Sequence, residues 1–280
     1  MNNITHIPEA KSAPSFAPQP DVMASNLYVP DTSVLTPETA LPARVQWKKR
    51  ADQKTLTSAL ASRALLGMDL YTAAPIRTGN RYPQQRNYHG YYWHSAARMQ
   101  LWHESLLERS ILMWLDHSKD IVAIATQPFT ILFADGTEHV PDFIALHANN
   151  KQVVYDVKPL CRINDHAAEQ FRKTKAICDE VGWGYEVHTE LSEPLASNLA
   201  WVQMFRHPRF YPGLASVQQL TDALTEPVSL DAIAALLPDL TLGNARAAVY
   251  HLVWERILDA DLTQPLSNTS LIRKASHAND

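Results

Sequence analysis

Apolar and polar residues form several short runs through the middle of the chain. The runs Ile121–Ala125 and Phe129–Phe133 are β-branched or aromatic, and the Asp135-Gly136 step that follows them is typical of a hairpin turn. The run His139–Leu146 returns from this turn, and Gln152–Pro159 follows after a second turn. The pattern therefore predicts a group of strands that are adjacent along the chain.

The segment before these strands predicts a helix from about Ser105 to His117, because apolar residues recur there at helical spacing. Ser105 is a good N-cap, and Glu108 three residues later completes a capping box. Glu108 also shares a stripe of the helix with Leu112, which turns its carboxylate towards the apolar side. A charge there requires a partner. Glu108 is therefore either a capping residue or a ligand for a cation.

A second helix is predicted after the strands, from Asn164, a typical N-cap, to Gly182, a typical C-cap. One more strand follows over Tyr185–Glu190. A strand that is reached through a helical crossover is typical of a sheet with helices packed on it. The order of elements thus favours a mixed α/β fold.

Candidate chemistry lies on the last two strands before the second helix. Asp156 and Lys158 are two residues apart, so their side chains should leave the same face of a strand. Asp142 lies on the preceding strand, and the intervening turn can bring it beside them. With Glu108, three carboxylates and one ammonium group would converge. Taken singly, Asp142 can merely start a strand, and Asp156 with Lys158 can be an ion pair at a sheet edge.

Clustered carboxylates raise one another's pKa, so this arrangement favours a hard divalent cation, Mg²⁺ with Mn²⁺ as a substitute. We expect Glu108, Asp142 and Asp156 to hold it. Such an ion would stabilise charge on a phosphodiester and help to generate the attacking hydroxide. Lys158 would orient or deprotonate that water, or stabilise the developing negative charge.

The pattern of Glu108, Pro141-Asp142 and Asp156-Val157-Lys158 resembles the PD-(D/E)xK nuclease superfamily of restriction enzymes. The stretches ESLLERSILMWLD, QPFTILFADGTEHVPDF and VVYDVKPLCR are more closely similar to TnsA, the endonuclease subunit of heteromeric cut-and-paste transposases. The resemblance covers about residues 86–190. It implies a restriction-endonuclease-like mixed sheet flanked by helices within residues 46–192. It also implies that Glu108, Asp142 and Lys158 are catalytic, and Asp156 completes the set.

Two departures from the TnsA pattern leave choices open. Some TnsA proteins have glutamine where this chain keeps Asp156, which is closer to restriction enzymes. Glu104, one turn before Glu108, is a rival for the helix glutamate, although Glu108 aligns better with the family residue.

The resemblance implies Mg²⁺-dependent cleavage of the 5′ strands at transposon ends, together with a TnsB-like transposase subunit and a TnsC-like ATPase. The alternatives are a stand-alone restriction or repair nuclease and a non-catalytic binding protein with a relic nuclease core.

Residues 193–280 are predicted to form a separate domain. Three helical segments, the middle one capped by Ser229, precede a short β wing, which suggests the winged-helix-like domain that TnsA proteins carry at their C-terminus. Arg246, Arg256, Arg273 and Lys274 can contact phosphates. Nearby aspartates and glutamates favour protein docking about equally.

The N-terminal part differs in composition from the rest. Residues 1–45 are rich in proline without an apolar period, so we expect a disordered tail. The segment from Arg77 to Ser95 then mixes arginines with tyrosine and tryptophan. It offers either phosphate contacts and stacking faces or an aromatic hairpin that packs on the core. The expected contacts to double-stranded DNA are Arg77, Arg81, Arg86, Lys173 and Lys175.

Composition limits the remaining choices. The chain has 280 residues, of which 46% are hydrophobic, and a net charge of −4, which excludes a uniformly basic nucleic-acid coat. No run approaches the ~20 apolar residues of a membrane span, and the start lacks the features of a signal peptide, so we expect a cytoplasmic protein. The two cysteines are expected to be free thiols. The twelve histidines are scattered and predicted not to be ligands.

Overall fold

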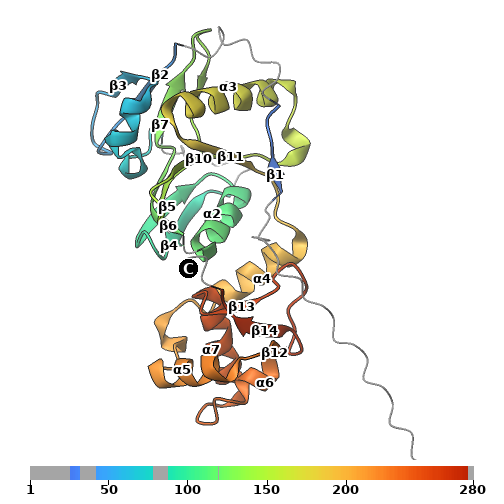
Figure 1. The fold of residues 1–280 in the computed structure, drawn as a ribbon. Coiled ribbons are helices and arrows are strands. Elements are labelled where there is room, and N and C mark those ends of the chain that lie inside the picture. The colour runs from blue at the N-terminus through green and yellow to red at the C-terminus, as the bar shows by residue number, and fades with distance from the viewer. Residues whose placement is uncertain (1–25, 32–41, 78–87, 119, 277–280) are drawn as a thin grey trace, which may run out of the picture.

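The computed structural model describes residues 26–31, 42–77, 88–118 and 120–276 (Figure 1). The fold is mixed α/β and contains several sheets, which confirms the predicted class. Among the described residues, none of the helices combines the length and the apolar character that a membrane crossing requires.

The central sheet has five strands in the order β1-β11-β10-β9-β6. The strand bounds are β1 Leu27–Tyr28, β11 Gly184–His188, β10 Gln152–Val157, β9 Phe143–His147 and β6 Ile121–Thr126. β10 and β11 are parallel, and the other neighbours are antiparallel. A parallel pair requires a crossover, which the short 3-10 helix η3 (Leu160–Arg162) and α3 (Asp165–Val181) provide.

Helix α3 forms where its capping residues predict it. The Asn164 side chain accepts a hydrogen bond from the amide of Ala167, and Gly182 ends the helix with a φ of 94°, in the left-handed region that favours glycine. Both predicted helix ends are thereby confirmed.

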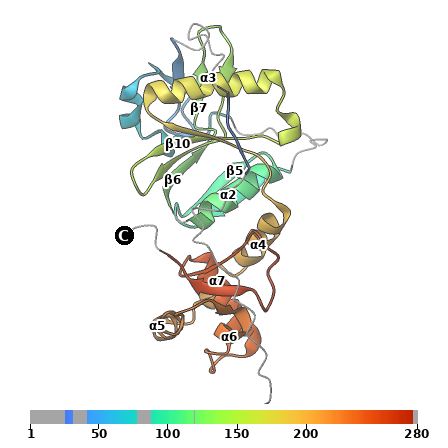
Figure 2. The same cartoon turned by 45° about the vertical axis from the view of Figure 1, so that its right-hand side comes forward.

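The two faces of the central sheet are covered by different helices. Val153 and Tyr155 of β10 belong to an apolar cluster with α2 (Leu106–Ser118), whereas Val154 packs in a second cluster with Ile177 and Cys178 of α3. This alternation follows from the two-residue period of a strand. Figure 2 shows α3 on one side of β10 and β6, and α2 on the other.

A second sheet lies beside the first, in the order β3-β2-β7-β8. Its strands are β3 Thr57–Leu60, β2 Arg44–Trp47, β7 Phe129–Leu132 and β8 Glu138–His139, and the 3-10 helices η1 (Arg63–Met68) and η2 (Leu70–Thr72) follow β3. A separate antiparallel hairpin consists of β4 (Gly90–His94) and β5 (Met99–His103). The Tyr/Trp-rich segment thus forms a hairpin from residue 90 onward, with Tyr92 buried in the core and Tyr91 and Trp93 exposed.

The C-terminal part contains the three predicted helical segments and a small sheet in the order β12-β14-β13. The helices are α4 Glu193–Gln203, η4 Pro208–Phe210, α5 Leu214–Ala223, α6 Leu230–Ala234 and α7 Leu242–Trp254. The strands are β12 Val228–Ser229, β13 Leu258–Ala260 and β14 Leu271–Lys274. Ser229 caps α6 by accepting a hydrogen bond from the amide of Ala232, as its position predicts.

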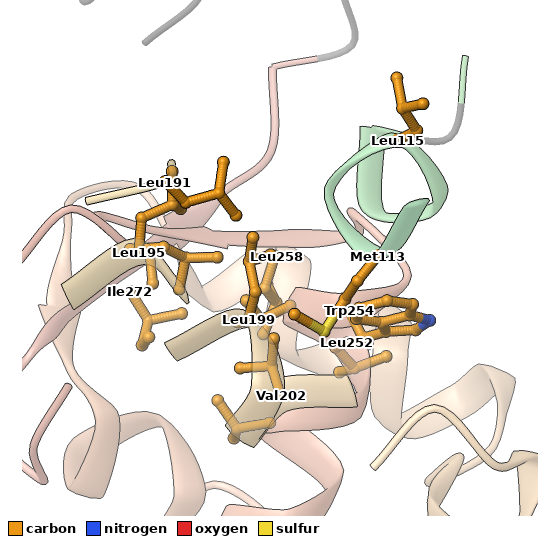
Figure 3. Packing of buried hydrophobic residues seen from close by; sticks show 14 of the residues in the cluster. Met113, Leu115, Leu191, Leu195, Leu199, Val202, Leu252, Trp254, Leu258 and Ile272 are labelled. Carbon is orange, nitrogen blue, oxygen red and sulfur yellow. The ribbon is translucent and has the colours of Figure 1, made fainter. Parts of the chain in front are cut away.

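The C-terminal part shares its apolar core with α2. Met113 of α2 points towards Trp254 of α7 (Figure 3), and both are buried in one cluster. His117 adds a hydrogen bond of 3.2 Å from its Nε2 to the carbonyl oxygen of Val253, and its ring lies 5.3 Å from that of Trp254. The C-terminal part therefore packs on α2 and belongs to one apolar cluster with it.

The prediction of a disordered tail over residues 1–45 is wrong at two places, because β2 already begins at Arg44 and a strand also forms earlier in the tail. Leu27–Tyr28 pairs antiparallel with β11, and the Tyr28 ring lies 6.0 Å from that of Phe171. Asn26 extends this attachment, since its carbonyl oxygen accepts hydrogen bonds from both the amide and the hydroxyl of Thr189. Backbone pairing and one aromatic contact thus hold a proline-flanked segment to the sheet edge. Residues 1–25 and 32–41 of the predicted tail lie outside the described residues.

Candidate active site

Glu108 lies in the first turn of α2 and is only 9% exposed. Its amide donates a hydrogen bond to the Ser105 hydroxyl, which in turn donates to Glu108 Oε1 over 2.8 Å. The Glu104 amide donates to Glu108 Oε2 over 2.7 Å. The reciprocal contacts predicted for a capping box are present, with Glu104 as the partner on the backbone side. Glu108 is therefore a fixed and buried carboxylate.

Asp142 directly precedes β9 and is tied to the neighbouring strand. Its Oδ2 accepts a hydrogen bond of 2.7 Å from the amide of Val157, the last residue of β10. Its own carbonyl oxygen accepts a bond of 2.8 Å from the Gln127 amide. The half-buried Asp142 is thus held at the point where β9 and β10 separate.

The pKa shifts of Asp142 and Glu108 reflect their burial and the charges of neighbouring carboxylates. Burial raises the pKa of Asp142 well above its usual value, and the neighbouring charges of Glu108 and Asp156 raise that pKa further. Burial also raises the pKa of Glu108, with the nearby Glu104 charge adding to it. We call Glu108, Asp142 and Asp156 the carboxylate centre. Its members come from a helix, a strand entrance and a strand, as their spacing predicts.

Asp156 has a different environment from the other two carboxylates. His139 Nε2 lies 2.8 Å from Asp156 Oδ2 and 3.0 Å from Oδ1, and the Tyr185 hydroxyl donates to Oδ2. Both oxygens are therefore engaged by side chains of β8 and β11. These contacts orient Asp156 beside Asp142 and leave it less available as a metal ligand than predicted.

Lys158 follows β10 and continues its pairing with β11, because its amide donates to the carbonyl oxygen of His188 over 3.0 Å. Its side chain is half-buried. In the described part of the chain, no carboxylate forms an ion pair with Lys158 Nζ, which excludes the predicted structural alternative of an Asp156–Lys158 pair. The ammonium group is therefore available near the end of β10.

Arg77 lies near the carboxylate centre. Its guanidinium is 3.6 Å from Glu104 Oε2, and its charge lowers the pKa of both Glu108 and Asp142. The Glu104 side chain is 28% exposed and paired, whereas Glu108 is buried next to Asp142. This geometry favours Glu108 over its rival Glu104. It also places the expected DNA contact Arg77 beside the carboxylates.

The other expected DNA contacts fare differently. Arg81 and Arg86 lie outside the described residues. Lys173 is buried, and its Nζ lies 2.6 Å from Asp135 Oδ2 and 2.8 Å from Thr137 Oγ1. It anchors the turn after β7 to α3 and is not a surface cation. Lys175 pairs with Asp179 one turn later on the same helix.

Sequence reasoning missed His139 and Tyr185. The histidines were expected to be uninvolved, yet His139 holds Asp156. A usable signal was its position three residues before Asp142, within the run His139–Leu146 that was predicted as one strand and that the structure divides into β8 and β9. Tyr185 gives a weaker signal, since only the parallel register of β10 and β11 brings it next to Asp156.

The donor set fits a divalent cation in part. Glu108 and Asp142 are oxygen donors whose pKa values are raised by burial, and the charge of Glu108 raises that of Asp142 further, a situation that a cation relieves. Mg²⁺ is commonly bound through one or two carboxylates plus water and substrate phosphates. Within the described residues, no group of three His, Cys, Asp or Glu side chains is arranged to hold a metal. A site of two carboxylates that substrate completes is therefore the best fit.

Comparison with known proteins adds no assignment. A scan of the chain against protein-family models finds no match, and a search of the curated proteins finds none either.

Proposed function

We propose that this chain is a Mg²⁺-dependent DNA endonuclease subunit of a cut-and-paste transposase, similar to TnsA, that cleaves the 5′ strands at transposon ends. One observation carries the proposal: burial raises the pKa of Asp142 at the start of β9, and the neighbouring charges of Glu108 and Asp156 raise it further. Neighbouring carboxylates with raised pKa values are typical of a site that completes itself with a cation. The resemblance to TnsA indicates the substrate, which is DNA at transposon ends, and the DNA strand that is cut, which is the 5′ strand.

Each residue has a defined role in this mechanism. Glu108 and Asp142 hold the ion, and the Val157 amide keeps Asp142 in position. When bound, Mg²⁺ would neutralise charge that develops on the phosphate and acidify the attacking water. Asp156, oriented by His139, accepts a hydrogen bond from that water. Lys158 donates to the phosphate oxygen that gains charge, or orients the water.

The finer fold assignment belongs to the same proposal. The order α2, β6, β7, β9, β10, α3, β11 and the crossover between β10 and β11 support a restriction-endonuclease-like core. Three helices with a small sheet support a winged-helix-like C-terminal domain. We place the boundary between the two at about residue 193.

The charge distribution supports a subunit that partners bring to DNA. Arg246 pairs with Asp231, while Arg256 and Arg273 both pair with Asp259. These arginines are largely neutralised by acids of the same domain, so we assign this domain to docking on a TnsB-like subunit or a TnsC-like ATPase. A stand-alone restriction-type nuclease is the second candidate, because Asp156 keeps the carboxylate of that pattern.

The test is cleavage of end-labelled duplex DNA in Mg²⁺, with and without a cognate TnsB-like transposase subunit. We expect cutting of the 5′ strand only with that subunit. Asp142→Ala should reduce the cleavage rate about a thousandfold, since a metal ion lowers the activation barrier by several kcal/mol and each 1.36 kcal/mol is a tenfold change in rate. Asp239→Ala, an exposed aspartate of the C-terminal part, is the control.

Three results would change the assignment. Efficient site-specific cutting by the chain alone would favour the restriction-type nuclease. Absence of cutting under all conditions by a well-folded chain would favour a relic nuclease core. Unchanged cutting by Asp142→Ala would remove the carboxylate centre from the mechanism.

A further inference from the structure

A hollow with a volume of about 360 Å³ lies between the β4–β5 hairpin, the first turns of α2 and the end of α4. The lining side chains that matter here are aromatic or basic: Tyr91, Trp93, Arg109, Arg206 and His207. We call it the aromatic hollow. Among the described residues no aspartate or glutamate lines it. Its chemistry is therefore opposite to that of the carboxylate centre.

The hairpin turns its aromatic faces outward because its inner residue is fixed. Tyr92 points into the core, and its hydroxyl donates to the buried Asp116 Oδ2 over 2.9 Å. Strand alternation then places Tyr91 and Trp93 on the opposite side, with exposures of 60% and 45%. Tyr91 is braced edge-on against Trp102, with 5.1 Å between ring centroids. Two large flat side chains are thus held at the surface.

The basic side of the aromatic hollow is also preorganised by contacts within the protein. Arg206, just after α4, donates to the Trp93 carbonyl oxygen over 2.9 Å, and its guanidinium lies 5.5 Å from the centre of the Tyr92 ring. Arg109 approaches from α2. In the described part of the chain, no carboxylate pairs with Arg109. An arginine cannot lose its proton in a protein, so Arg109 presents a permanent charge to whatever occupies the hollow.

We propose that the aromatic hollow binds one unpaired nucleotide of a DNA strand. The base stacks on Trp93 or Tyr91, and its phosphate contacts Arg109. Aromatic faces combined with arginines are typical of single-strand recognition, where each base stacks regardless of its identity. The volume, at the lower end of the usual range for small-ligand sites, suits a nucleotide and not a duplex.

The hollow also has a fixed relation to the carboxylate centre. Arg109 directly follows Glu108 in α2, and successive residues of a helix point about 100° apart around its axis. A strand that leaves the carboxylate centre can therefore pass into the hollow around one helix turn. This part rests on the proposed function, and it identifies the substrate as DNA that is unpaired beside the cut.

The binding test uses the whole chain in EDTA, so that cleavage plays no part. The probe is fluorescein-labelled (dT)15, followed by anisotropy, and a blunt 15-base-pair duplex serves as comparison. We expect Trp93→Ala to weaken (dT)15 binding about tenfold. Arg109→Gln should reduce the slope of log K against log salt by about 0.7, as one single-strand phosphate contact requires. Duplex binding should stay within about twofold for both variants.

Matched controls separate the hollow from general surface effects. Trp201, also 45% exposed but not part of the hollow, provides Trp201→Ala, and the exposed Arg63 of η1 provides Arg63→Gln. Both should bind (dT)15 like the wild type. A (dT)15 carrying one central 2-aminopurine should lose fluorescence on binding, because its base stacks, and lose less with Trp93→Ala.

The outcomes are separable from those of the proposed function. Wild-type affinity in both Trp93→Ala and Arg109→Gln, or equal losses for duplex and single strand, would overturn the unpaired-nucleotide site. Displacement of (dT)15 by an equal concentration of polyglutamate would also overturn it, in favour of an acidic peptide. Intact (dT)15 binding by a chain that never cuts with Mg²⁺ would instead remove only the nuclease proposal.

Discussion

The carboxylate centre and the aromatic hollow use neighbouring residues of α2 and have opposite chemistry. Glu108 faces Asp142 and carries a raised pKa, whereas Arg109 lines the hollow beside outward-facing aromatic rings. Among the described residues, the first region is rich in carboxylates and the second in basic and aromatic side chains. A metal-bound phosphate in the first and a nucleotide of the same strand in the second would satisfy both.

The two regions also differ in whether their charged groups can be neutralised by a proton. A buried carboxylate can lower its cost by taking up a proton, which the raised pKa of Asp142 reflects. Arginine has no such option, so its charge must remain near water or meet an anion. This agrees with the burial of Glu108 and Asp156, whereas Arg109 is only half-buried. Substitutions in the two regions should therefore affect different measurements.

The largest expected effect is on strand cleavage in Glu108→Gln. Glutamine keeps an oxygen that can accept from the Glu104 amide, so the start of α2 should survive, but the negative charge is lost. If Glu108 holds the cation, cleavage should fall by at least about a hundredfold. Binding of (dT)15 in EDTA should not change, because the neighbouring Arg109 is intact.

Glu104→Gln is the matched control for this result. It removes the partner of Arg77 but keeps the backbone amide that bonds Glu108. Cleavage should stay within a few-fold of the wild type. The opposite order, with Glu104→Gln inactive and Glu108→Gln active, would assign the helix role to Glu104 and leave Glu108 as a cap.

The second effect is on stability, and its sign depends on pH. The folded-state pKa of Asp142 is raised, so the contribution of this one group to stability is greatest below the unfolded value of about 3.9 and falls as pH rises through the folded pKa. The asparagine side chain of an Asp142→Asn variant would not titrate. This variant should therefore match the wild type near pH 4 and have a higher Tm at pH 7 to 8, measured without metal.

Magnesium should reverse this difference. A concentration ten times the Kd stabilises the wild type by about 1.4 kcal/mol if only the folded state binds it, and the variant should gain much less. A variant that is less stable than the wild type at pH 7 in EDTA would show that the Asp142 carboxylate is a structural acceptor for Val157. A wild type whose Tm ignores Mg²⁺ would count against the metal site.

How far the sequence predicted each region depends on the reach of its interactions. The caps of α2 and α3 act within a few residues, so Ser105, Asn164 and Gly182 located these helices correctly. The carboxylate centre was also predictable in outline, because strand alternation and one hairpin connect Asp142 with Asp156. Local rules with fixed periods were sufficient for these features.

The features that the sequence did not predict depend on distant partners. The strand Leu27–Tyr28 has only two residues and pairs with β11 about 160 positions later. Arg206 reaches the aromatic hollow from 113 residues beyond Trp93. Lys173 is buried because Asp135 lies beside it, which the helical pattern of α3 does not reveal. No short-range rule connects such pairs.

The smallest expected effect concerns DNA binding by Lys173→Gln and Lys175→Gln. Lys173 is enclosed, holds Asp135 and Thr137, and lies 5.0 Å from the centre of the Phe133 ring, so it cannot reach a phosphate without leaving these contacts. Lys173→Gln should lower the Tm, whereas Lys175→Gln removes only an exposed pair within one helix and should change it little.

Neither variant should alter the slope of log K against log salt for (dT)15 or for the duplex. Arg109→Gln, in contrast, should reduce the slope for (dT)15. This contrast follows from where the charges lie: Lys173 and Lys175 have carboxylate partners on their own side of the sheet, and Arg109 has none in the described part of the chain. Each phosphate contact to duplex DNA contributes about 0.9 to the slope. A fall of that size for the duplex with Lys175→Gln would show that DNA also crosses α3, on the sheet face opposite α2, and would return that helix to the binding surface.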